Sequence, residues 1–197
     1  MNKQDVIAFF DGLAPQWDAE MIRHDEIIGK ILDNAGITAD TEVLDVACGT
    51  GVLLPDYLKR GVKSVTAIDI SPEMVKIARR KFPEENVHIL CGDAEEIVPE
   101  PKFDCIVIYN AFPHFPDPEK LIRHLSACLK PGGRLTVAHG MSRADIDRHH
   151  SGAASRVSVG LLHEDALAAL MAPYLRVITK ISDEKMYQVV GEKTREV

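Results

Sequence analysis

The feature that most constrains the fold is an alternation of short apolar segments with segments of helical pattern. The apolar segments are, in chain order, EVLDVA, SVTAIDI, VHILC, FDCIVIY and RLTVAHG, and helix-like sequence follows each of them. Two of the helical segments begin with a capping residue and a proline, at Ser71-Pro72 and at Asp117-Pro118. Such alternation predicts a parallel sheet with helices on both faces.

Both ends of the chain depart from this alternation. Near the start, apolar residues from Val6 to Trp17 recur at helical spacing, and Pro15 predicts a break between two short helices. A second apolar stripe runs from Ile27 to Ala35 and ends at Gly36. Towards the other end, HEDALAALMAP has a helical pattern, and YLRVITKIS and KMYQVVGEK have strand patterns with so short a link that only antiparallel pairing is possible. The expected fold class is α/β, a Rossmann-like three-layer sandwich with a mostly parallel seven-stranded sheet and a C-terminal antiparallel hairpin.

Charge and cysteine content limit the expected partners. The net charge of −7 opposes broad binding to nucleic-acid backbones or anionic membranes, because like charges repel. The cysteines have neither CxxC nor metal-knuckle spacing, which favours reduced thiols; they are Cys48, Cys91, Cys105 and Cys128. The first residues lack the apolar core of a signal peptide, and no apolar run is long enough to cross a bilayer. We expect a cytoplasmic protein that neither binds nucleic acid nor inserts into membranes.

A glycine-containing loop follows the first strand, in VLDVACGTGVL. Gly49 and Gly51 let the backbone turn sharply and approach a ligand closely. The dinucleotide fingerprint G-x-G-x-x-G would need a third glycine where the chain has Leu54, and no Walker A lysine is present. The loop therefore gives little support to a nicotinamide or flavin cofactor.

Acidic residues follow the next two strands. Asp69 ends the second strand, where a carboxylate can accept hydrogen bonds from both hydroxyls of a ribose. Asp93 follows the third strand in CGDAEE. Together with the glycine loop, these residues lie at the carboxyl edge of the predicted sheet, where open α/β folds bind ligands.

From about Val43 to Val137 the chain resembles the class I S-adenosylmethionine (SAM)-dependent methyltransferases. It is most similar to the small-molecule type related to the ubiquinone and menaquinone C-methyltransferases. Four segments carry the resemblance in the expected order, namely LDVACGTG, AIDISPEMVKIAR, GDAEEI and LKPGGRL.

The resemblance implies SAM as the cofactor and assigns the residues that hold it. Asp45 and the Ala47–Gly51 backbone would hold the methionine end, and Asp69 would bind the ribose. Asp93 would reach the adenine amino group. The full set implied to bind the cofactor is Asp45, Ala47, Cys48, Gly49, Gly51, Asp69, Ile70, Asp93, Ala94 and Asn110. Ala47 departs from the family pattern, which usually has glycine there.

The acceptor side is expected beyond the fourth and fifth strands. The Asn/Asp-Pro-Pro-Tyr signature of amino-methylating members is absent, since Asn110 is followed by Ala-Phe-Pro. His114 and His139 follow these two strands, and each is a candidate catalytic base or, alternatively, a hydrogen-bonded structural histidine. His149 and His150 would diverge by about 100° on a helix, which disfavours shared metal binding. We predict no metal site, although a site formed by His114, His139 and one of this pair is geometrically possible.

The sequence thus predicts one methyltransferase domain over residues 1–197. Its expected parts are an N-terminal helical cap (1–36), a cofactor-binding core (43–138), acceptor-side helices (139–173) and a C-terminal hairpin (174–193). Within the cap, Phe10 and Trp17 either screen the sulfonium from water or complete the core. The expected reaction is O- or S-methylation of a small-molecule acceptor. The alternatives are C-methylation of a quinone-like ring and a non-catalytic SAM-binding partner protein.

Overall fold

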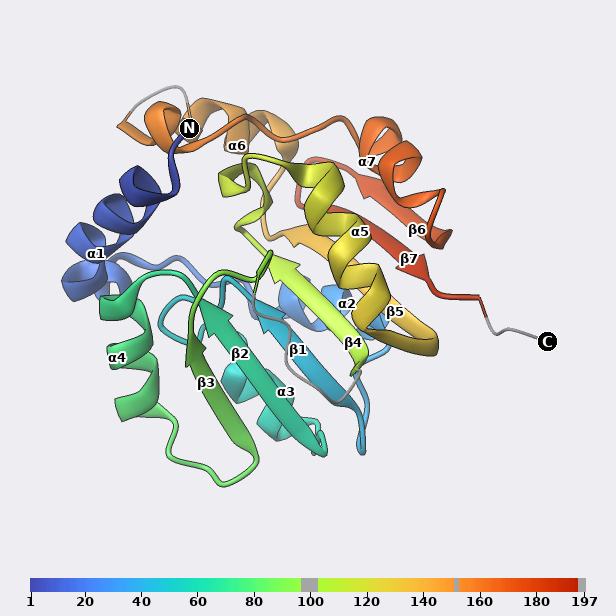
Figure 1. Cartoon of the computed structure of the whole chain (residues 1–197), viewed down its shortest axis with the longest axis horizontal. Coiled ribbons are helices and arrows are strands. Elements are labelled where there is room, and N and C mark those ends of the chain that lie inside the picture. The colour runs from blue at the N-terminus through green and yellow to red at the C-terminus, as the bar shows by residue number, and fades with distance from the viewer. Residues whose placement is uncertain (97–102, 151–152, 195–197) are drawn as a thin grey trace.

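The computed structural model describes residues 1–96, 103–150 and 153–194, whose strands form one seven-stranded sheet in the order β3-β2-β1-β4-β5-β7-β6 (Figure 1). The strands are β1 (Glu42–Val46), β2 (Ser64–Asp69), β3 (Val87–Cys91), β4 (Phe103–Tyr109), β5 (Leu129–His139), β6 (Arg176–Ser182) and β7 (Tyr187–Glu192). Strands β1 to β5 pair in parallel, whereas β7 is antiparallel to both β5 and β6. The predicted sheet and its C-terminal hairpin are confirmed.

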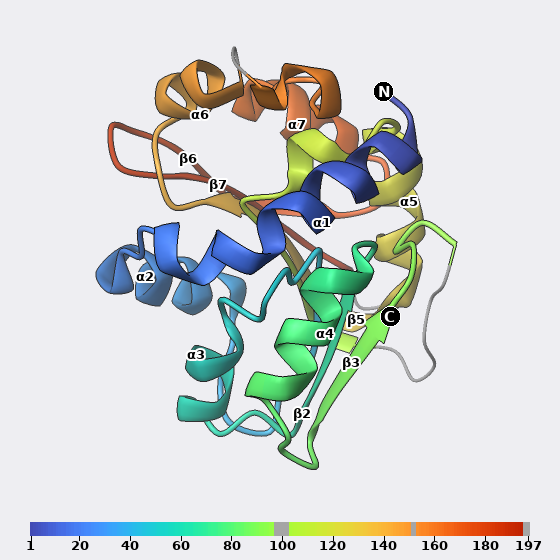
Figure 2. The same ribbon diagram turned by 90° about the vertical axis from the view of Figure 1, so that its left-hand side faces the viewer.

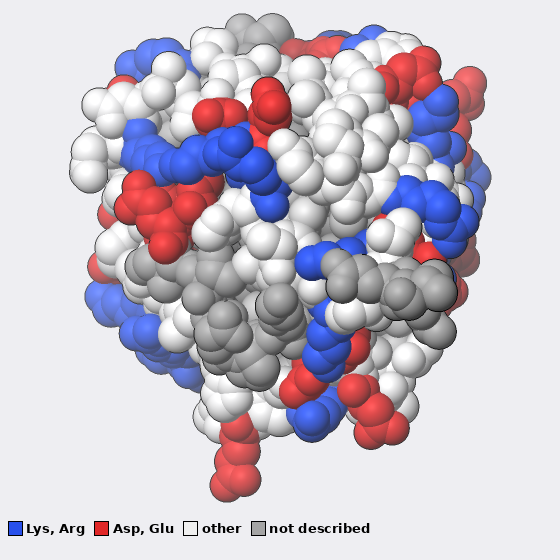
Figure 3. All heavy atoms as spheres, turned by 45° about the vertical axis from the view of Figure 1, so that its right-hand side comes forward, with Lys and Arg blue, Asp and Glu red and all other residues white. Residues whose placement is uncertain are grey.

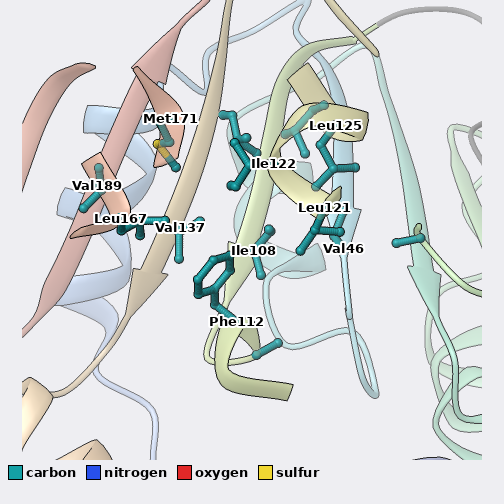
Figure 4. Packing of buried hydrophobic residues seen from close by; sticks show 14 of the residues in the cluster. Val46, Ile108, Phe112, Leu121, Ile122, Leu125, Val137, Leu167, Met171 and Val189 are labelled. Carbon is teal, nitrogen blue, oxygen red and sulfur yellow. The ribbon is translucent and has the colours of Figure 1, made fainter. Parts of the chain in front are cut away.

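Helices cover both faces of the sheet. They are α1 (Lys3–Glu20), α2 (Asp25–Ala35), α3 (Leu54–Lys59), α4 (Pro72–Lys81), α5 (Pro118–Cys128), α6 (Arg143–His150) and α7 (Glu164–Met171), with short 3-10 turns η1 (Phe112–His114) and η2 (Ala153–Val157). One buried apolar cluster joins the sheet to α5 and α7, and a second joins it to α2, α3 and α4. Figure 4 shows the first cluster, with Leu125 of α5 and Met171 of α7 near the strands. The layers are those of the predicted three-layer sandwich.

Strand β4 shows why a central strand is apolar throughout. Successive side chains on a strand point to opposite faces. Ile106 and Ile108 belong to the cluster under α5 and α7, while Cys105, Val107 and Tyr109 belong to the cluster under α2, α3 and α4. A strand buried on both faces needs apolar side chains at successive positions, and here the pattern continues up to the end of the strand.

The predicted helix boundaries rest on capping groups that the structure confirms. The Ser71 hydroxyl accepts a hydrogen bond from the Met74 backbone N–H at 3.2 Å, and the Asp117 carboxylate accepts one from the Lys120 N–H at 2.9 Å. Gly36 ends α2 with a φ of 79°, in the left-handed region that glycine adopts at least cost.

The predicted break at Pro15 is wrong, because α1 continues through this residue as one helix. A proline inside a helix removes only one N–H donor, although its ring also crowds the preceding turn. Contacts on both sides of Pro15 hold the helix in place. Asp11 accepts a hydrogen bond from the Ser71 hydroxyl at 2.5 Å, and Asp18 accepts one from the Thr50 hydroxyl at 2.5 Å. Tertiary contacts therefore override the local signal.

Charged side chains are mixed over the surface shown in Figure 3, where acidic and basic groups lie next to one another. The ion pair of Arg176 on β6 with Glu192 on β7, at 2.6 Å, is of this kind. Among the helices that the structure describes, none combines the length and the apolar character that crossing a bilayer requires.

Candidate cofactor and acceptor site

The carboxyl ends of β1, β2, β3 and β4 border one cavity of about 460 Å³, a size typical of small-molecule sites. Helix α1 covers it, contributing Val6, Phe10 and Trp17 to its wall. Figure 2 shows α1 lying across the molecule above α4. Most of the predicted site residues line this cavity, namely Ala47, Cys48, Gly49, Asp69, Ile70, Asp93, Ala94, Asn110 and His114.

The two glycines of the loop after β1 have different surroundings. A Cβ built on Gly49 would have only Nε1 of Trp17 within 4 Å, at 3.9 Å, so this position opens into the cavity. A Cβ on Gly51 would lie 2.6 Å from Cε2 of Phe82 and 2.9 Å from Cδ1 of Leu54. Gly51 does not line the cavity. Its lack of a side chain allows close packing against Phe82 and Leu54.

Two residues other than glycine on the cavity wall have left-handed backbones, Ala47 with φ 57° and Asn110 with φ 53°. Asparagine tolerates this region better than alanine does. Asn110 is also held by hydrogen bonds, because its N–H donates to the Ala138 carbonyl at 2.9 Å and its Oδ1 accepts from the Gly140 N–H at 3.0 Å. Ala47 stands where the family usually has glycine, and its backbone is strained.

Asp69 connects the glycine loop to the start of α4. Its two carboxylate oxygens accept hydrogen bonds from the Gly49 N–H at 2.8 Å and the Ser71 N–H at 2.9 Å. Burial raises the pKa of Asp69, and these backbone hydrogen bonds oppose the increase. A carboxylate has about four acceptor sites, so Asp69 keeps capacity for a ribose hydroxyl in the cavity.

Asp93 is already paired across the cavity by the N-terminus of α1. The ammonium of Lys3 donates to one Asp93 carboxylate oxygen and, at 3.0 Å, to Glu95, whose side chain is only 2% exposed. Burial lowers the pKa of Lys3, but pairing with these two carboxylates outweighs it and raises the pKa overall. Asp93, which the resemblance predicts to reach the adenine, therefore also contacts α1, the helix that covers the cavity.

Asp45 does not line the cavity, contrary to the predicted contact. It lies buried in β1, and its Oδ2 has no hydrogen-bond partner among the described residues. Burial first, and then the charge of Asp69, raise the pKa of Asp45 well above its ordinary value. Burial first, and then the charges of Asp69 and Asp45, raise the pKa of the Cys48 thiol, which lies on the cavity wall.

His114 lies on the acceptor side of the cavity. Its Nδ1 is 2.6 Å from the carbonyl oxygen of Val157, and its ring meets Phe10 edge to face at 4.9 Å. A carbonyl oxygen only accepts hydrogen bonds, so Nδ1 carries the hydrogen and the lone pair of the neutral ring is on Nε2. Phe10 in turn packs on Trp17 at 5.9 Å, which places both predicted aromatic residues on the cavity wall.

His139 does not line the cavity, so the expectation that it faces the acceptor needs correction. It is 3% exposed at the end of β5, and its ring lies 6.1 Å from that of Tyr187 on β7. The reason is strand parity. Val137 faces the cluster under α5 and α7, so His139, two residues on, points to the same buried face. The side chains of His149 and His150 lie outside the described residues. Elsewhere in the described chain, no group of three His, Cys, Asp or Glu residues is arranged to hold a metal ion.

The structure adds wall residues that sequence reasoning missed. They are mainly Lys3 of α1, Arg23 of the α1–α2 link, Tyr109 at the end of β4, Phe115 after η1 and Met141 after β5. Tyr109 and Met141 adjoin strand ends, which is a signal that could have identified them. Lys3 and Arg23 could not be found in this way, because their position depends on how α1 packs over the sheet.

The residues at β1 to β3 fit SAM. Gly49 leaves a space that a Cβ would fill, and Asp69 keeps acceptor capacity within the cavity. Near the loop, Asp45 has a buried carboxylate oxygen that has no hydrogen-bond partner among the described residues. The ammonium group at the methionine end of SAM would stabilise the ionised form of this carboxyl.

Comparisons with known proteins agree with this reading. Residues 44–137 match the family model described as "Methyltransferase domain". A ubiquinone biosynthesis O-methyltransferase of Xanthomonas axonopodis pv. citri is 39% identical over 117 residues, which cover 57% of this chain and 47% of the relative. A malonyl-[acyl-carrier protein] O-methyltransferase of Priestia megaterium is 31% identical over 141 residues, which cover 68% of this chain and 51% of the relative. The chain thus spans about half the length of these curated relatives.

Among solved structures, the N-methyltransferase NodS of Bradyrhizobium japonicum WM9, in complex with S-adenosyl-l-homocysteine, has a TM-score of 0.74 at 16% identity. The match covers 98% of this chain and 99% of that one, which shows that the two proteins share the fold. Residues 44–137, which include the ends of β1 to β4 that border the cavity, therefore form a methyltransferase domain of the class I SAM-dependent type.

Proposed function

We propose that this protein transfers the methyl group of SAM to a hydroxyl oxygen of a small aromatic acceptor in the cytoplasm, with His114 as the general base. The observation that carries the proposal is the His114 ring on the cavity wall, with Nδ1 at 2.6 Å from the Val157 carbonyl. This contact favours the tautomer whose Nε2 can accept a proton. A positioned base of this kind typically accelerates a reaction by roughly 100- to 10,000-fold.

On the cofactor side, we assign the loop Ala47–Gly49 to the methionine end, Asp69 to the ribose and Asp93 to the adenine. Bound SAM supplies an activated methyl group on a positively charged sulfonium. The contribution of the chain is to position this group and to exclude water, which strengthens electrostatic interactions within the site. Helix α1 supports this role, since Phe10 and Trp17 both line the cavity that it covers.

The acceptor side of the cavity favours a neutral, apolar ring. The cavity wall that includes His114 also includes the apolar residues Phe10, Ala111, Phe115 and Met141. A phenolic hydroxyl resembles that of tyrosine, whose ordinary pKa is about 10, so it needs a base near neutral pH. A thiol, with an ordinary pKa of about 8.5, is partly ionised already and depends less on a base. The presence of a positioned imidazole therefore favours O-methylation over S-methylation.

Two other functions remain as alternatives. The resemblance to the ubiquinone and menaquinone C-methyltransferases favours methylation of a quinone-like ring carbon, for which removal of a ring hydroxyl proton by the same histidine would raise the nucleophilicity of the ring. A non-catalytic SAM-binding partner protein would use the cofactor side alone. The free cysteines are consistent with the proposed cytoplasmic location.

The test combines product analysis with matched histidine variants. Release of S-adenosylhomocysteine would be measured with phenol, hydroquinone and thiophenol as acceptors, and methyl-¹³C SAM would show by NMR whether oxygen, carbon or sulfur is methylated. His114→Gln should lower turnover of phenols about 100-fold with unchanged SAM affinity by calorimetry. His88→Gln, at an exposed position of β3, is the control. Wild-type turnover should fall as pH drops through the range where histidines protonate, roughly pH 6–7.

Three outcomes would contradict the proposal. An acid limb that persists unchanged in His114→Gln would remove this residue as the base. A ring-methylated product would favour C-methylation. Tight SAM binding without turnover of any acceptor in the panel would favour the non-catalytic alternative.

A further inference from the structure

The hydroxyl of Tyr109 is a polar group on the acceptor side that the proposed reaction leaves without a role. Tyr109 ends β4, is 8% exposed and lines the same cavity as His114. It belongs to the apolar cluster under α2, α3 and α4 and also lines the cavity, so it lies at the boundary between the two. A buried phenol normally finds a hydrogen-bond partner.

The position of the hydroxyl is set by the absence of a side chain at Gly140. A Cβ built on Gly140 would lie 2.3 Å from the Tyr109 hydroxyl oxygen and 3.3 Å from Cζ. No atom can approach that closely without displacement, so the phenol occupies the space that any other residue at position 140 would take. The chain thus fixes the hydroxyl between the end of β4 and the residue that follows β5.

Asn110 places a second polar side chain beside this hydroxyl. Its Oδ1 accepts a hydrogen bond from the Gly140 N–H at 3.0 Å, so the amide is anchored to the residue whose missing side chain makes room for the phenol. Burial raises the pKa of Tyr109, and the Asn110 side chain opposes that increase. The phenol therefore keeps its proton near neutral pH and can donate a hydrogen bond to a ligand in the cavity that Tyr109 lines.

We infer that the Tyr109 hydroxyl donates a hydrogen bond to the reacting oxygen of the acceptor and thereby selects oxygen over sulfur nucleophiles. This inference rests on the proposed function. As His114 takes the proton of the acceptor hydroxyl, negative charge develops on that oxygen, and a fixed donor aimed at it stabilises the charge. Sulfur is a weak hydrogen-bond acceptor, so a thiol gains little from the same donor.

The experiment measures kcat/KM for phenol and for thiophenol in the full chain. Tyr109→Phe removes only the hydroxyl and should lower kcat/KM for phenol about 10- to 100-fold, with at most about a threefold loss for thiophenol. Gly140→Ala keeps the phenol but displaces its hydroxyl, and should shift the ratio in the same direction. Tyr187→Phe is the matched control, because this buried tyrosine on β7 does not line the cavity and its hydroxyl has no partner among the described residues.

Calorimetry with SAM and thermal unfolding accompany each variant, to separate selectivity from cofactor binding and folding. An unchanged ratio of phenol to thiophenol in folded Tyr109→Phe would overturn the inference and leave the proposed function standing. Equal losses for both acceptors would also overturn it, since they indicate a structural role. Wild-type enzyme that binds SAM but methylates neither probe would refute the proposed function itself, and this inference with it.

Discussion

The two loop glycines offer a matched test of which residue meets the cofactor. Alanine at Gly49 or Gly51 meets a left-handed backbone, with φ of 56° and 88° respectively, and this strain costs about 1 kcal/mol or more at either position. At Gly49 the new Cβ has open space in the unliganded protein. At Gly51 it lies 2.6 Å from Phe82 and 2.9 Å from Leu54, which adds an overpacking cost of about 1–3 kcal/mol.

The expected results for the two variants are opposite. Gly49→Ala should lower the free energy of unfolding by about 1 kcal/mol, and should weaken SAM binding at least about tenfold, because its methyl group occupies space assigned to the cofactor. Gly51→Ala should lose about 2–4 kcal/mol of stability but retain most SAM affinity in the folded fraction. Urea unfolding and SAM calorimetry measure the two quantities. Normal SAM affinity in Gly49→Ala, or a stability loss equal to that of Gly51→Ala, would refute this reading of the loop.

Three further predictions concern the same edge of the sheet. Ala47→Gly should relieve the strained backbone and raise the free energy of unfolding by about 0.4–1 kcal/mol in urea melts. The pKa of Asp45 is raised in the folded state, so above the ordinary value of 3.8 this carboxyl is more ionised in the unfolded state than in the folded one. The free energy of unfolding therefore falls as the pH rises above that value. Asp45→Asn should stabilise the unliganded protein at pH 7 but not near pH 3, as urea melts at the two pH values would measure. Asp18→Ala removes the contacts of α1 with Thr50 and Lys81, at 2.5 and 2.7 Å, and should speed SAM dissociation in stopped-flow measurements.

Much of the fold was predictable because its signals are local and repeated. The capping residues Ser71 and Asp117 mark helix starts by hydrogen bonds to nearby backbone groups, and these bonds form whatever the rest of the chain does. Where strands and helices alternate, the parallel strands end at the same edge of the sheet. Asp69 and Asp93 could therefore be predicted to lie near one another without knowing any distance, and both line the cavity. The edge of the sheet that borders the cavity was therefore largely predictable from the sequence.

The acceptor side was less predictable because it depends on strand parity and on long-range packing. His139 was chosen because it follows a strand, yet the pleat turns it to the face covered by Tyr187. Tyr109, at the end of the neighbouring strand, lines the cavity instead. A shift of a strand end by one residue changes which side chain points into the cavity. Strand ends cannot be predicted from sequence to within one residue, so the sequence could not decide between such neighbours. The role of Lys3 depends on how α1 crosses the sheet, which no local pattern encodes.

Several unfavourable features of this protein lie beside the cavity, where a ligand would relieve them. Asp45 and Asp69 are buried carboxyls with raised pKa values, and Ala47 and Asn110 hold left-handed backbones on the cavity wall. A positively charged, hydrogen-bonding cofactor would offset part of these costs in the folded state alone. Binding and folding are then coupled, so SAM should raise the melting temperature in proportion to the logarithm of its concentration, and less so in Asp69→Asn.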